Sequence, residues 1–185
     1  MVLVIFLAHL KKFEYTVDAD NNFPMHDGGK VIFGRDWFIK ETANLVLAKK
    51  YSKFGSYYWR APFGSGKTVF LKLMGRELQR LGCDVYMTSG GALQQFDEDY
   101  FPNLAKQAAG KTVVLLIDEV QADLNSMHWI PLLKGSKPAN LLVLGVGIPL
   151  IGQHSPQFDH KYPNIDYRFP MFLTINDLPE VYAYF

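Results

Sequence analysis

The sequence has few of the features that mark disulfide-stabilised, metal-binding or highly charged proteins. Cys83 is the only cysteine in 185 residues, which excludes an internal disulfide and a CxxC metal site and is typical of a reducing compartment. The 19 basic and 18 acidic side chains give a net charge of +1, so no charge excess indicates a nucleic-acid or membrane partner. Internal repeats and low-complexity tracts are also absent from the sequence. Composition therefore favours an ordinary globular domain.

The apolar N-terminal run, MVLVIFLAHL, is too short to span a membrane as a helix. No basic residue precedes the run and no small-residue cleavage site follows it, which argues against a signal peptide. We expect an intracellular protein, cytoplasmic or nuclear. Residues 1–30 are expected to form a buried strand followed by a surface loop over 18–30, which is rich in Asp, Asn, Gly and Pro.

Beyond residue 30, apolar patterns of helical and strand period alternate along the chain. Pro102 is expected to restrict its helix to the second part of the segment or to bend it. Alternation of strands and helices predicts an α/β fold with three layers, in which helices flank a mainly parallel β-sheet. In chain order, the expected elements are a helix over 36–51, a strand over 56–60, a helix from 67 that stops at 82, strands over 83–89, 112–118 and 139–147 with a crossover helix within 97–110, and a final strand over 167–174 before a helix over 175–185.

Apolar residues at helical spacing predict which side of each long helix faces the core. The alternation of Tyr57, Tyr58 and Trp59 on a strand likewise fits core packing better than base stacking on nucleic acid. The residues at helical spacing that predict the first helix are Trp37, Phe38, Thr42, Leu45, Val46 and Tyr51. The core-facing residues expected in the second helix are Val69, Phe70, Leu73, Leu78 and Leu81.

The segment YYWRAPFGSGKTVFL, residues 57–71, matches the phosphate-loop pattern [AG]-x-x-x-x-G-K-[ST] between an expected strand and an expected helix. In such a loop, backbone N–H groups hold phosphates, the lysine bridges the β- and γ-phosphates, and the hydroxyl ligates Mg²⁺. Ala61 replaces the usual first glycine, where a methyl group costs little at negative φ. A purely structural glycine-rich turn is the alternative. The residues predicted to bind the nucleotide are Ala61, Pro62, Phe63, Gly64, Ser65, Gly66, Lys67, Thr68 and Val69.

A second motif, VVLLIDEVQ over 113–121, is an apolar strand that ends in two acids about 50 residues beyond Lys67. The carboxyl end of such a strand is where α/β sheets bind ligands. Asp118 is expected to hold Mg²⁺ through its hydration shell, with Thr68 as the other metal ligand. Glu119 is expected to orient and deprotonate the attacking water, so Lys67 and Glu119 are the predicted catalytic residues. No N-K-x-D guanine motif occurs, which favours ATP over GTP.

With these two motifs the chain resembles the ASCE division of P-loop NTPases, which includes AAA+ and STAND-like ATPases. The resemblance implies an ATP-binding, Mg²⁺-dependent hydrolase with a Walker A motif at Ala61–Thr68, a Walker B motif at Val113–Glu119 and a catalytic glutamate after the Walker B aspartate. The segment VIFGRDWFIKE, 31–41, is similar to a box that opens such modules, which implies that Arg35 and Asp36 cap the first helix near the nucleotide.

The same motifs, with LLVLGVGIP and the closing segment FLTINDLPEVYAYF, also resemble the NTPase module of Crinkler-type effectors over about residues 31–185. This resemblance implies that 31–185 is a P-loop ATPase domain. The sequence also departs from this family in two expected respects. We expect no C-terminal lid or downstream domain, and we expect no N-terminal leader of the kind found in secreted members.

Other departures concern catalysis. Gly145 and Gly147 stand where many ASCE ATPases end a strand with a polar residue facing the γ-phosphate, and Gln121 or a backbone amide is a candidate substitute. Arg168 is better interpreted as a surface charge than as an arginine finger. Three functions stay open: an ATPase that acts on a protein partner, a nucleotide-binding switch or interaction module with little hydrolysis, and a truncated fragment of a Crinkler-type multidomain protein. A protein partner is expected, and oligomerisation is left open.

Overall fold

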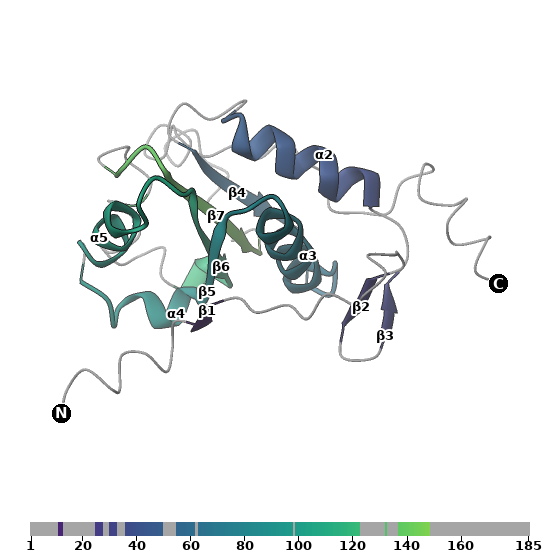
Figure 1. The fold of residues 1–185 in the computed structure, drawn as a ribbon. Coiled ribbons are helices and arrows are strands. Elements are labelled where there is room, and N and C mark those ends of the chain that lie inside the picture. Colours follow the sequence, from purple (N-terminus) through teal and green to yellow (C-terminus); the bar gives the residue numbers. More distant parts are fainter. Residues whose placement is uncertain are drawn as a thin grey trace.

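The computed structural model describes residues 11–12, 25–27, 30–32, 36–49, 55–61, 63–97, 99–122, 132 and 137–148. Its central sheet has five strands in the order β1-β5-β6-β7-β4 (Figure 1). Strands β4 to β7 run parallel, and the short β1 pairs antiparallel with β5 at the edge. The expected α/β fold with a mainly parallel sheet is confirmed. The strands are β1 (Lys11–Lys12), β4 (Ser56–Arg60), β5 (Asp84–Ser89), β6 (Val113–Asp118) and β7 (Leu141–Gly147).

Helices cover both faces of the sheet, because the parallel strands β4 to β7 have apolar side chains on both sides. On β6, Val114 and Leu116 pack with α2 and α3, whereas Leu115 and Ile117 pack with α4, α5 and η1. This two-sided burial explains why β6 and β7 are apolar without interruption. The helices are α2 (Asp36–Leu47), α3 (Lys67–Arg80), α4 (Gly90–Leu93), α5 (Tyr100–Gln107) and the 3₁₀ helix η1 (Val120–Ala122).

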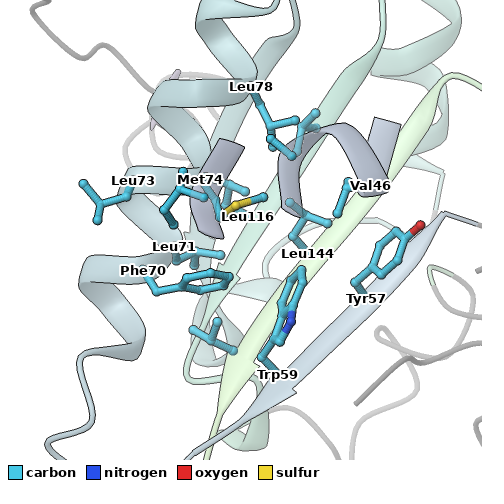
Figure 2. Packing of buried hydrophobic residues seen from close by; sticks show 14 of the residues in the cluster. Val46, Tyr57, Trp59, Phe70, Leu71, Leu73, Met74, Leu78, Leu116 and Leu144 are labelled. Carbon is cyan, nitrogen blue, oxygen red and sulfur yellow. The ribbon is translucent and has the colours of Figure 1, made fainter. Parts of the chain in front are cut away.

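Aromatic packing fixes the two elements on either side of the glycine loop. Trp59 on β4 meets Phe70 in the first turns of α3 edge-on, with ring centroids 5.2 Å apart (Figure 2). Phe38 of α2 lies against the Phe70 ring as well, with ring centroids 5.8 Å apart. Tyr57, Tyr58 and Trp59 are all buried, as the alternation in the sequence predicted. The strand that enters the loop and the helix that leaves it are therefore held by one core cluster.

The helix ends differ from the sequence expectations. α2 ends at Leu47 rather than near 51, because Lys49 adopts a left-handed backbone with φ 51° and donates its N–H to Val46 O at 3.0 Å. The prediction that Leu81 faces the core is wrong: it follows the last turn of α3, next to the left-handed Gly82, and is 37% exposed. α5 begins at Tyr100, so Pro102 lies in its first turn, where a missing N–H costs no helical hydrogen bond.

The expected surface loop over 18–30 contains part of a hairpin. β2 (Met25–Asp27) pairs antiparallel with β3 (Lys30–Ile32), and Asp27 lies opposite Lys30. A Gly-Gly connection between such short strands is a known hairpin signal, and the loop prediction passed over it. The expected N-terminal strand within 1–10, Arg35, the elements expected after 148 and Arg168 lie outside the described residues. Among the helices that the structure describes, none combines the length and apolar character needed to cross a bilayer.

Candidate nucleotide-binding site

The glycine loop leaves β4 at Ala61 and enters α3 at Lys67. The Ala61 N–H donates to Gly147 O at 3.1 Å, which ties the start of the loop to the end of β7. Among described non-glycine residues only Lys49, Ala109 and Glu119 have positive φ, so Ala61 carries its methyl group without backbone strain. Pro62 lies outside the described residues, and Phe63 at the loop apex is 94% exposed.

The inner part of the loop has the backbone and the space that a phosphate group needs. Gly64 and Gly66 adopt left-handed backbone, with φ 75° and 82°, and a Cβ at either position would have no atom within 4 Å. The first helical hydrogen bond runs from Phe70 N–H to Gly66 O at 2.8 Å. The N–H groups of the first turn of α3, which include those of Thr68 and Val69, therefore precede that bond, as in helix N-termini that bind anions.

Two polar side chains of the loop are buried. Ser65 Oγ has no hydrogen-bond partner in the described part of the chain, although an unsatisfied buried hydroxyl costs about 1–3 kcal/mol. Lys67, at the start of α3, is only 5% exposed, so its side chain lies largely out of water. Open space beside two glycines, an unpartnered hydroxyl and an enclosed ammonium fit a phosphate group.

The two predicted metal ligands come together in the fold. Thr68 Oγ1 donates to Asp118 Oδ2 at 2.8 Å, and Asp118 Oδ1 accepts from the Glu119 N–H at 3.0 Å. The contact forms because α3 packs across β6, which ends at Asp118. In the part of the chain that the structure describes, no cluster of three or more His, Cys, Asp or Glu could hold a metal. Mg²⁺ suits two protein oxygens because it keeps several waters and takes phosphate oxygens as further ligands.

Glu119 follows Asp118 on a strained turn, with a left-handed φ of 51°. Its Oε2 accepts a hydrogen bond from Gln121 Nε2, and Gln121 Oε1 accepts one from Ile148 N–H at 3.2 Å. A Cβ on Gly147 would collide with this Gln121 oxygen and approach the Tyr58 hydroxyl to 2.7 Å. A side chain at position 147 would therefore have to displace the Gln121 amide and the Tyr58 hydroxyl.

The turn after β6 also depends on close packing with Gly90, the first residue of α4. A Cβ on Gly90 would collide with the Glu119 carbonyl oxygen and lie 3.1 Å from both the Glu119 carbon and Val120 Cα. Gly91 is exposed, and the atom nearest to a Cβ added there would be Ala122 Cβ, at 4.0 Å. The two glycines therefore form a matched pair on one helix.

We expect Gly90→Ala to lower the free energy of unfolding by roughly 1–3 kcal/mol, because rigid backbone must move. Gly91→Ala is expected to be neutral or to stabilise by up to about 1 kcal/mol, since alanine is the better helix former. Equilibrium urea unfolding of both variants measures the difference. Equal stabilities would contradict the close approach of Gly90 to the Glu119 backbone.

No protein-family model matches the chain, and the comparison with curated proteins finds no match. Among solved structures, a Trip13 from Rhizobiales is similar with a TM-score of 0.51 and 16% identity, over 74% of this chain and 62% of that one. DnaA from Aquifex aeolicus bound to AMPPCP is similar with a TM-score of 0.50 and 15% identity, over 76% of this chain and 48% of that one. A replication initiator DnaA bound to AMPPCP and single-stranded DNA has a TM-score of 0.50 and 13% identity, over 87% of this chain and 52% of that one.

At these identities the likeness concerns the fold. Together with the parallel sheet and its flanking helices, it defines an α/β fold of the P-loop NTPase type, which this chain shares with the Trip13 and DnaA structures. The match spans between about half and three fifths of each of these solved chains.

Proposed function

We propose that residues 31–185 form an ATPase domain that binds ATP with Mg²⁺ and hydrolyses it. The observation that supports this most strongly is the 2.8 Å hydrogen bond from Thr68 Oγ1 to Asp118 Oδ2, which joins the two sequence motifs in a P-loop NTPase fold. The AMPPCP in two of the similar DnaA structures, an ATP analogue, also favours ATP. The sequence resemblance to Crinkler-type modules, a protein partner and oligomerisation belong to the proposal on sequence grounds.

Each residue has a distinct task in this function. The loop from Ala61 to Val69 surrounds the phosphates with backbone N–H groups, and Lys67 neutralises the β- and γ-phosphate oxygens. Thr68 and Asp118 would hold Mg²⁺, which when bound offsets phosphate charge. Glu119 accepts the proton of the attacking water. Oxygen attack on the γ-phosphorus and cleavage of its bond to the β-phosphate oxygen give ADP and phosphate.

Gly66 and Gly82 allow a test that separates a phosphate loop from a structural glycine turn. Both have left-handed backbone, with φ 82° and 87°, and both leave open space around a Cβ. Alanine at either site should therefore cost the fold a similar amount, about 1–2 kcal/mol. Only Gly66 lies where backbone approaches the phosphates, so we expect Gly66→Ala alone to weaken ATP binding, by at least about tenfold.

Isothermal titration of both variants with ATP and Mg²⁺ measures this difference, and urea unfolding checks that their stabilities match. If Gly66→Ala binds ATP as tightly as Gly82→Ala and the wild type, the loop is a structural turn and the proposed function is wrong.

A further inference from the structure

Gln121 links the carboxylate of Glu119 to the strand end that also anchors the glycine loop. Its Nε2 donates to Glu119 Oε2, and its Oε1 accepts from Ile148 N–H at 3.2 Å. Gly147, which precedes Ile148, accepts a hydrogen bond at its carbonyl oxygen from the Ala61 N–H at 3.1 Å. A short connection of hydrogen bonds and backbone therefore joins Glu119 to the start of the loop.

The polarity of this arrangement is fixed by chemistry. A glutamine amide has one accepting oxygen and one donating nitrogen, whereas a backbone N–H such as that of Ile148 can only donate. Gln121 must therefore turn Oε1 to Ile148 and leave Nε2 for Glu119. A flipped amide would place its oxygen against the carboxylate and its NH₂ group against the Ile148 N–H. The arrangement therefore directs a donor, Gln121 Nε2, at the Glu119 carboxyl group.

Steric constraints act from both sides. Gly147 gives the Gln121 oxygen the space it occupies, because a Cβ there would collide with it. On the other side, Gly90 packs against the Glu119 carbonyl, and Glu119 has a left-handed φ of 51°, a strained conformation for a residue with a side chain. Backbone and side chain of Glu119 are thus both held, the first by close packing and the second by Gln121.

We propose that Gln121 is a positioning residue that orients the Glu119 carboxylate for catalysis. The inference rests on the proposed ATPase function and adds to it a residue that follows the predicted Walker B span Val113–Glu119 by two positions. Gln121 touches neither phosphate nor water in this role, since it acts through Glu119. It also takes the place at the end of β7 where the sequence has glycine instead of a polar side chain.

The test is Gln121→Met, which keeps the length and approximate volume of the side chain and removes both hydrogen bonds. We expect kcat to fall about 10- to 100-fold, because the base loses its orientation, while ATP affinity stays within about twofold. Gln95→Met is the matched control, since Gln95 is exposed in the turn after α4. Thermal unfolding of each variant shows whether the turn stays folded.

A double-mutant cycle separates positioning from a general structural effect. If Gln121 acts through Glu119, adding Gln121→Met to Glu119→Gln should cost no further turnover in a single-turnover assay with labelled ATP. A full additional loss in that background would overturn the inference, and so would an unchanged or raised kcat of Gln121→Met beside an active wild type. In these three cases the proposed function stands. A wild type that binds ATP without turnover would overturn both the inference and the hydrolytic part of the function.

Discussion

Glu119→Gln is expected to bind ATP and Mg²⁺ like the wild type and to lose turnover by about 10²- to 10⁴-fold. Glutamine has nearly the same shape, and its side-chain oxygen still accepts the hydrogen bond from Gln121. It cannot take a proton from water at neutral pH, so only the chemical step suffers. Phosphate release at steady state and equilibrium ATP binding, measured on the same preparation, separate the two effects.

Glu41→Gln is the control for this variant, because Glu41 is exposed on α2. Its turnover should equal that of the wild type. If the wild type binds ATP but turns over no faster than Glu119→Gln, Glu119 is not a base. The chain is then better described as a nucleotide-binding switch, the alternative that the sequence left open.

Lys67→Ala is expected to weaken ATP binding by about 2–5 kcal/mol, which is roughly 30-fold to several thousandfold in Kd. The Lys67 side chain is 5% exposed at the start of α3, so its interaction with phosphate is little screened by water. Turnover at moderate ATP concentrations should disappear with binding. Titration with a fluorescent ATP analogue measures the loss.

Lys72→Ala on the same helix is the matched control, because Lys72 is half-buried and lies outside the loop. It should keep wild-type affinity. Thermal unfolding of both variants tests for a loss of fold. A folded Lys67→Ala protein with wild-type affinity would contradict contact between the ammonium and the phosphates.

The sheet was predictable because its strands are buried on both faces. The run SYYWR predicted β4 to the residue, because aromatic residues favour strands. The run over 112–118 predicted β6 within one residue, since an uninterrupted run of β-branched and other apolar residues is typical of a strand covered on both sides. The position of the glycine-bearing turn between β4 and α3 was also predictable, because its glycines stand between a strand pattern and a helix pattern.

Features that depend on contacts distant in sequence were harder to predict. Leu81 fits the apolar period of α3, but the chain turns away at Gly82 before Leu81 can reach the sheet. Gln121 was singled out only as a substitute for a missing polar residue. Its link to Ile148 joins η1 to the end of β7, 27 residues further along the chain, and no local pattern encodes that distance. The glycine at 147 was the one signal, because a glycine at a buried strand end often marks a close approach.

The most direct test of the central claim is ATP hydrolysis by the wild-type chain with Mg²⁺, compared with the same protein in EDTA and with Glu119→Gln. We predict that ADP and phosphate form in equal amounts, that EDTA abolishes their formation, and that Glu119→Gln binds ATP without turning it over. If the folded wild type neither binds ATP nor releases phosphate, the loop from Ala61 to Thr68 is not a nucleotide site, and the proposed function is wrong.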